Sequence, residues 1–223
     1  MSGTDPKDPG RSSWPADPVE RAAAAAAAGL RRPVEAPTLE VLARLVHDDT
    51  DPRVRAAALG ALARLPDPPP GAWARAAADA DPSVRRRAAD VAPVFARSSE
   101  EIAAGLLTVL ADDDPAVAEA AAWALGELGP AATEAGAVRR LAEAAMAHGD
   151  PLVREAAVAA LGALGDQHGL EAVLAACRDK PAIRRRAVLA LAAFDGPAVD
   201  EALRAALEDK DWQTRQAAED LLG

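Results

Sequence analysis

The sequence predicts an all-α protein, an α-solenoid (superhelix) of about six two-helix repeats. One observation is composition, because 50% of the residues are hydrophobic but only 3% are aromatic. Such an alanine- and leucine-rich chain suits helices that pack closely together. The second observation is a short pattern that recurs along the chain, as in solenoids whose units pack mainly on their neighbours. The third is that no stretch alternates polar and apolar residues as a half-buried strand would.

The recurring pattern opens with an acidic residue and a proline, as in DPRVRAAALGAL from Asp51. Six copies, spaced by 30 to 36 residues, start at Asp51, Asp81, Asp114, Asp150, Lys180 and Asp211. We number columns from this start residue, which is column 0. Aspartate in column 0 is a favoured N-cap at the positive end of a helix dipole, and proline suits the first helical position. Each copy therefore predicts the start of a helix.

Columns 3, 7 and 11 predict one buried stripe along each of these helices. Column 3 holds Val54, Val84, Val117, Val153, Ile183 and Thr214. Column 7 holds alanine in every copy, at Ala58, Ala88, Ala121, Ala157, Ala187 and Ala218. Column 11 holds Leu62, Ala92, Leu125, Leu161, Leu191 and Leu222. An alanine in every copy indicates that a neighbouring backbone comes too close for a larger side chain.

A second helical pattern precedes each copy and makes every repeat a helical hairpin. These first helices are expected at residues 38–46, 72–78, 100–111, 136–147, 169–177 and 197–207. Glycine- and proline-rich turns such as PDPPPG at 66–71 and LGP at 128–130 separate the helices.

This arrangement resembles the HEAT-repeat family, in particular the short repeat also found in phycobilisome lyases, over about residues 38–223. In that family an aspartate in the turn between helices and an arginine just after the valine link neighbouring repeats in a ladder. The matching aspartates are Asp49, Asp79, Asp112 and Asp209, and the matching arginines are Arg55, Arg85, Arg154, Arg184 and Arg215. Arginine is missing at Ala118, and aspartate is missing at His148 and Arg178. The resemblance therefore implies a ladder that is interrupted in the middle.

Both ends of the repeat array are expected to be capped. Residues 1–16 are rich in proline, glycine, serine and aspartate and are predicted to be a disordered tail. Residues 17–223 are predicted to form the solenoid, with a capping helix from Asp17 and a polar capping repeat from Asp211. The alanine run after Arg21 follows acidic rather than basic residues, which argues against a signal peptide. With no membrane span and a single cysteine, a cytoplasmic location is expected.

Columns 2, 5 and 9 vary freely in polarity and mark the uncovered side of the second helices. The family resemblance implies that this side lines the concave surface. The partner-binding residues expected there are Arg53, Arg86, Asp90, Glu119, Trp123, Glu155 and Arg185. Their mixed charges fit a protein or peptide, whereas phosphate recognition needs a sustained positive groove, which a net charge of -10 also opposes. For the arginines, the alternative is ordinary solvated surface.

Trp123 is the unusual residue on this side. It occupies column 9, where other copies hold residues as different as Gly60 and Asp90, so a partly exposed tryptophan is expected. Exposed tryptophans are enriched among interface hot spots. The alternative is that Trp123 folds back onto adjacent helices. Trp73 and Trp212 are interpreted as packing residues.

No catalytic residue, metal site or cofactor is predicted. Three histidines at separate helix ends and one cysteine, Cys177, supply neither a zinc set nor a nucleophile signature. Cys177 is interpreted as a buried small residue, with a reactive thiol as the alternative. The predicted function is a non-enzymatic scaffold or adaptor that binds a protein or peptide along the concave face. The alternatives are a nucleic-acid-binding protein like the HEAT-like alkylpurine DNA glycosylases, or a bilin lyase-like subunit. Self-association is left open.

Overall fold

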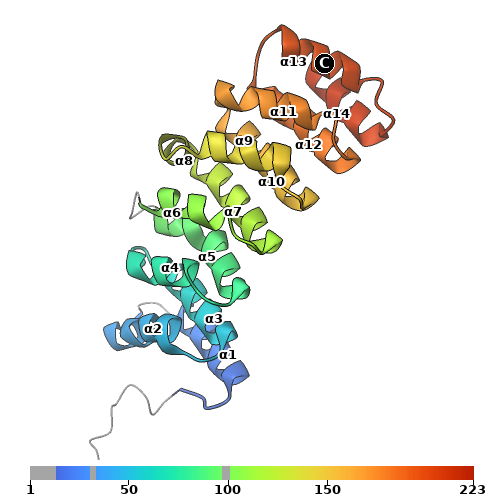
Figure 1. Cartoon of the computed structure of the whole chain (residues 1–223). Coiled ribbons are helices and arrows are strands. Elements are labelled where there is room, and N and C mark those ends of the chain that lie inside the picture. The colour runs from blue at the N-terminus through green and yellow to red at the C-terminus, as the bar shows by residue number, and fades with distance from the viewer. Residues whose placement is uncertain (1–13, 31–33, 97–100) are drawn as a thin grey trace, which may run out of the picture. The chain divides into compact units, whose positions relative to one another are not determined.

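The computed structural model describes residues 14–30, 34–96 and 101–223, and the regular elements within these ranges are all helical. Of the predicted disordered tail, residues 1–13 lie outside the described residues. Contacts divide the chain into two compact units, residues 1–99 and 100–223, here called the N-terminal and C-terminal units. Each unit is a row of helical hairpins, so the predicted all-α class is confirmed (Figure 1).

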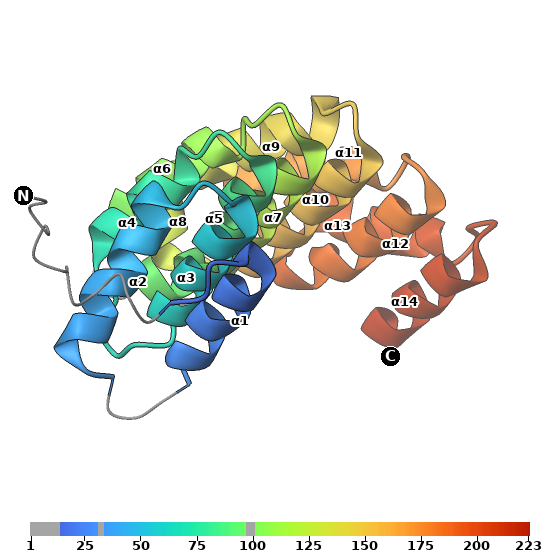
Figure 2. The same ribbon diagram turned by 90° about the horizontal axis from the view of Figure 1, so that it is seen from below.

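The N-terminal unit has two layers of helices. In one layer α1 (Pro18–Ala28) packs on α3 (Pro52–Leu62), which packs on α5 (Pro82–Phe95). In the other layer α2 (Ala36–Asp48) packs on α4 (Pro70–Ala77), and each also packs on the helix that follows it (Figures 1 and 2). The expected capping helix from Asp17 thus lies against α3 in the manner of a second helix.

The C-terminal unit continues the same plan. Its second helices are α7 (Pro115–Leu128), α10 (Pro151–Leu164), α12 (Pro181–Ala190) and α14 (Trp212–Leu222), which pack successively side by side. Its first helices are α6 (Glu101–Val109), α9 (Ala137–Ala147), α11 (Leu170–Ala176) and α13 (Pro197–Ala206) (Figure 2). Single 3-10 turns, Gln167–Gly169 and Leu191–Ala193, precede α11 and follow α12.

One short helix was not predicted, α8 (Pro130–Glu134), between α7 and α9. It occupies the longest interval between repeats, the 36 residues from Asp114 to Asp150. Ala132 in α8 is fully buried, so the additional residues add to the core of the unit.

The second helices begin where the repeat pattern places them, because their first residues are capped. The Oδ1 atom of Asp81 accepts a hydrogen bond from the backbone amide of Ser83 at 2.9 Å, and Asp114 accepts from Ala116 at the same distance. Lys180, which stands in the same column, provides no side-chain cap. Proline follows Lys180 as it follows Asp81, and its fixed φ still favours a helix start.

The predicted stripe is buried. Columns 3 and 7 are at most 1% exposed in all six copies, and column 11 is equally buried in the first five. In α14 the column 11 residue, Leu222, is 45% exposed.

Successive second helices approach one another almost backbone to backbone. A Cβ atom added to Gly162 in α10 would lie 2.7 Å from the Cβ and 2.9 Å from the Cα of Ala190 in α12. The same column 12 to column 10 contact occurs in three pairs, Gly29 with Ala61, Gly126 with Ala160, and Gly162 with Ala190. Small residues in these two columns therefore allow the close approach of these three helix pairs.

The two tryptophans predicted to be packing residues, Trp73 and Trp212, differ in how far their side chains are buried. Trp73 is 4% exposed, and its Nε1 donates a hydrogen bond to the carbonyl of Ala88 at 2.8 Å, which confirms the prediction. For Trp212 the prediction is wrong, because this side chain is 63% exposed. It occupies the first position of α14, where a side chain extends beyond the helix body into solvent.

Candidate functional site

Arginine and aspartate side chains join successive turns within each unit. In the N-terminal unit, Arg55 donates from Nε and Nη2 to the two carboxylate oxygens of Asp79, at 2.8 and 2.7 Å. Its Nη1 donates to the carbonyl of Asp49 at 2.8 Å, so one guanidinium links two turns. Asp79 also accepts the backbone amide of Asp81 at 2.9 Å. Such bidentate, charge-assisted bonds fix the geometry of a pair.

The C-terminal unit repeats this pairing twice. Arg154 donates to both oxygens of Asp179 at 2.7 and 3.0 Å, and Arg184 donates to both oxygens of Asp209 at 2.8 and 2.7 Å. The hydrogen bonds from Arg154 lower the pKa of Asp179, and those from Arg184 lower the pKa of Asp209, although burial opposes both shifts. At the end of the row, Arg215 donates to the carbonyl of Asp209 at 2.6 Å.

Sequence reasoning missed two members of these pairs. Arg21 in α1 donates to both oxygens of Asp49 at 2.6 and 3.0 Å, and it stands in the same column as Arg55. Where Arg178 replaces the expected aspartate, the next residue, Asp179, pairs with Arg154 instead. The row of arginine–aspartate pairs is therefore not interrupted at this turn. Both could have been found by aligning the pattern from Asp17 and by allowing a one-residue shift in the turn.

One arginine–aspartate pair is missing from the row, because both of its positions hold other residues. Ala118 lacks the guanidinium, and His148 stands at the turn position of the next repeat, where other turns carry a carboxylate. The Nδ1 atom of His148 accepts the backbone amide of Asp150 at 3.1 Å, as Asp112 accepts that of Asp114 at 2.9 Å. The histidine thus keeps the hydrogen bond that shapes the turn without requiring an arginine partner. In the turn before Asp81, Arg85 donates to the carbonyl of Asp79 at 2.9 Å.

Trp123 lies on the uncovered side of the second helices in the C-terminal unit. Its side chain is 40% exposed, and the guanidinium of Arg186 from α12 lies over the indole, 5.5 Å from the ring centroid. This distance is within the range of a cation–π contact. The Nη2 atom of Arg186 is also 3.5 Å from Oε1 of Glu155 on α10, so three helices meet at this point.

An open hollow of about 380 Å³ lies beside Trp123. Alanine and glycine residues form much of its lining, and the larger residues that line it are Trp123, Arg186 and Leu189. Leu189 occupies the same column as Trp123 and is 44% exposed. The site therefore offers apolar surface, an aromatic ring and charges of both signs. We call Trp123, Glu155, Arg186 and Leu189, together with the two glutamates four residues before and after Trp123 on α7, Glu119 and Glu127, the tryptophan cluster.

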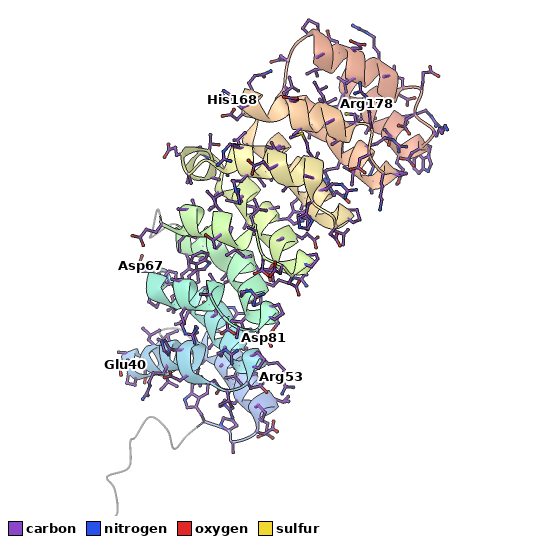
Figure 3. All side chains as sticks on the ribbon, viewed as in Figure 1. Glu40, Arg53, Asp67, Asp81, His168 and Arg178 are labelled. Carbon is purple, nitrogen blue, oxygen red and sulfur yellow. The ribbon has the colours of Figure 1, made fainter. Side chains whose placement is uncertain are left out.

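The predicted partner-binding residues fall into two groups. Glu119, Trp123, Glu155 and Arg185 belong to the C-terminal unit, and Arg185 donates to the side-chain oxygen of Gln213. The others belong to the N-terminal unit and are described by themselves. Arg53 is held by the carboxylate of Asp51 at 3.0 and 2.7 Å, at the start of α3 (Figure 3). Arg86 and Asp90 are exposed, and Asp90 lies 3.9 Å from Arg87.

A larger hollow of about 760 Å³ lies in the C-terminal unit and is lined mainly by α11 and α13. Cys177 lines it and is partly buried, and burial raises the pKa of its thiol to about 11. The raised pKa argues against the alternative of a reactive thiol, and the expected full burial of Cys177 is met only in part. His168 precedes α11 and Arg178 follows it (Figure 3), and of these two residues only Arg178 lines this hollow.

Among the described residues, no three histidine, cysteine, aspartate or glutamate side chains come together as a metal site would require. His47 pairs with Asp48 at 2.7 Å and His168 with Asp166 at 2.8 Å, each at an exposed helix end. Within the same ranges, no helix is both long and apolar enough to cross a membrane.

Comparisons with known proteins agree with this architecture. A family model described as HEAT repeats matches residues 15–91, 69–145 and 138–223. No curated protein matches the chain. The structure of the Escherichia coli protein YibA has a TM-score of 0.69 at 18% identity, with 93% of this chain and 77% of that chain covered.

Two engineered proteins are also similar. One has a TM-score of 0.61 at 22% identity, with 82% of this chain and 94% of its own covered. The other is a computationally designed armadillo repeat protein for modular peptide recognition, with a TM-score of 0.53 at 15% identity and coverage of 89% and 97%. At these identities the likeness shows the fold, a solenoid of tandem helical repeats, as the sequence predicted.

Proposed function

Because the chain belongs to the HEAT-repeat family, whose solenoids offer long surfaces for binding, we propose that it is a non-enzymatic scaffold or adaptor that binds a protein or peptide. The binding surface is the uncovered side of the second helices, and its centre in the C-terminal unit is the tryptophan cluster. The designed armadillo repeat protein, which was made for modular peptide recognition, supports this use of the fold. That likeness concerns architecture, so the proposal rests on the residues of this chain.

The exposure of Trp123 is the observation that carries the proposal. A tryptophan that is 40% exposed beside an open hollow leaves apolar surface in water, which a partner would remove. Truncation of a tryptophan that acts as an interface hot spot costs about 2 kcal/mol or more of binding free energy. Charged residues of both signs, Arg186 and Glu155, lie beside Trp123. A partner bound at Trp123 would contact them too, and these contacts would fix its position along the surface.

The cationic side chains give less support to a nucleic-acid partner. Arg53 pairs with Asp51 at 2.7 Å and Glu155 lies 3.5 Å from Arg186, so a phosphate that approached either arginine would also meet a carboxylate. The chain as a whole has a net charge of -10.

The test is affinity capture on the immobilised full-length chain from native lysate, with mass spectrometry of the retained proteins. Trp123→Ala is compared with Trp212→Ala, which removes another exposed tryptophan from the same unit. We expect a defined protein to be retained by the wild type and Trp212→Ala but lost with Trp123→Ala. Retention of the same proteins by all three would contradict the assignment of Trp123. Retention dominated by nucleic acid, released between about 50 and 200 mM salt, would contradict the protein-binding function.

Stability must be measured beside capture. Because Trp123 is partly exposed, Trp123→Ala should leave the helix content and melting temperature nearly unchanged. A loss of many degrees would mean that Trp123 is a core residue and that reduced capture reports unfolding.

A further inference from the structure

Trp123 lies between two carboxylates on its own helix. Glu119 and Glu127 stand four residues before and four residues after it, and residues at this spacing share one side of a helix. From Pro115 to Leu128 helix α7 carries no lysine or arginine. Among the described residues, no hydrogen bond or ion pair engages the carboxylate of Glu119 or Glu127. An aromatic ring between two unpaired carboxylates on one side of a helix favours a cation.

A cation already occupies this ring, and it is poorly held. Arg186 lies 5.5 Å from the centroid of Trp123, but its contact with Glu155 is 3.5 Å long. The Nε atom of Arg186 is buried and has no hydrogen-bond partner in residues 14–30, 34–96 and 101–223. By contrast, Arg184 on the same helix makes two bonds of 2.8 and 2.7 Å to one carboxylate. A buried donor without an acceptor is costly, so Arg186 loses little when it leaves the ring.

We propose that the tryptophan cluster binds an arginine or lysine side chain of the partner, and that Arg186 is the residue this side chain displaces from Trp123. The proposal rests on the proposed function and names the partner's chemistry. The partner's cation stacks on the indole and pairs with Glu119 and Glu127, which Arg186 does not reach with an ion pair. Displaced Arg186 turns toward solvent, where water satisfies its Nε.

The hollow beside the ring specifies a second feature of the partner. Leu189, Ala159 and Ala193 offer apolar surface next to the cation position. An apolar partner side chain adjacent to the basic one would fill this space. The cluster therefore selects a segment that carries a basic residue next to an apolar residue. The net charge of -10 on the chain attracts such a basic segment at long range.

The experiment is selection of displayed random peptides on the full-length chain, followed by affinity measurement with the synthetic peptides selected. We expect the peptides that require Trp123 to contain arginine or lysine next to an apolar residue. Substitution of that basic residue by alanine should weaken binding about tenfold or more, as should the double variant Glu119→Gln with Glu127→Gln. Glu171→Gln with Glu201→Gln, on the first helices, changes charge equally and is the control.

Arg186→Ala gives the sharpest result, because removal of a competitor should tighten binding by about 2- to 5-fold. Arg139→Ala, which removes the same charge from an exposed position on α9, should change affinity much less. Weaker binding in Arg186→Ala, or no difference from Arg139→Ala, would overturn the displacement. Selected peptides that require Trp123 but lack a basic residue would overturn this inference and leave the proposed function intact. If no selected peptide requires Trp123, both fail.

Discussion

Replacement of Gly162, which lines the hollow beside Trp123, by alanine should force α10 and α12 apart. The added Cβ would lie 2.7 Å from the Cβ and 2.9 Å from the Cα of Ala190. Non-bonded carbon atoms settle at about 3.5 to 4.0 Å, so the two helices must separate by roughly 1 Å. Neither atom of Ala190 belongs to a flexible side chain that could move aside.

The change in unfolding free energy of Gly162→Ala is the sum of two opposing contributions. Overpacking of this kind costs about 1 to 3 kcal/mol of unfolding free energy. Alanine in place of glycine inside a helix returns about 1 kcal/mol. Gly162→Ala should therefore be destabilised by up to about 2 kcal/mol. Gly60→Ala in α3 is the matched control, because its Cβ would meet nothing closer than Nε of Arg87 at 3.8 Å. That variant should be more stable than the wild type by about 1 kcal/mol.

Urea unfolding of the full-length chain, followed by far-UV circular dichroism, measures both effects. The two variants should shift the midpoint in opposite directions and differ by about 1 to 3 kcal/mol. A Gly162→Ala protein as stable as Gly60→Ala would refute the reasoning, because it would mean that the second helices are not held at backbone contact distance.

The other predictions concern a carboxylate, two tryptophans and the thiol. Because Arg154 lowers the pKa of Asp179, the stability from this pair is present above the ordinary carboxyl pKa of about 3.9 and is lost as pH falls through the lowered folded value. The stability deficit of Asp179→Asn in urea unfolding should thus be largest at neutral pH and shrink toward about pH 2; a constant deficit would exclude the ion pair as its cause. Trp73→Phe should lose about 0.5 to 1.5 kcal/mol for its hydrogen bond, beyond lost packing, whereas Trp212→Phe should change stability by less than about 0.5 kcal/mol; equal calorimetric melting shifts would contradict this. With a pKa of about 11 instead of 9.0, Cys177 should hold about 100-fold less thiolate at pH 8, so a chromogenic disulfide reagent should react far more slowly with the native than with the urea-unfolded chain. Equal rates would contradict burial of the thiol.

The helices could be predicted because the same capping residues and apolar positions recur in successive repeats. An N-cap aspartate and a following proline each recur in five of the six copies, and columns 3, 7 and 11 are apolar in all copies except for Thr214, so the copies confirm one another. The short helix α8 escaped because it occurs in a single interval and has no second copy to compare with. Trp212 was misread because its column holds proline elsewhere, and the pattern does not report how far a first-turn side chain extends into solvent.

The tryptophan cluster could be predicted only in part. The varied residues of column 9 indicated that Trp123 is partly exposed, and helical spacing placed Glu119 beside it. The contact with Arg186 was not predictable, because it joins side chains 63 residues apart in sequence on helices that are not neighbours in the layer. Asp179 was missed for a related reason, since a shift of one residue in a turn leaves its carboxylate within reach of the same guanidinium.

The sequence by itself determined the helical repeat, its buried columns and the class of fold. Capping and apolar periodicity depend on residues only a few positions apart, and both can be recognised from the repeated pattern. Only the tertiary structure decided which ionic groups meet, which tryptophan remains in solvent and where the helices leave open space. Those features depend on side chains that extend across two or three helices, and their final positions follow from the backbone spacing that small residues such as Gly162 and Ala190 allow.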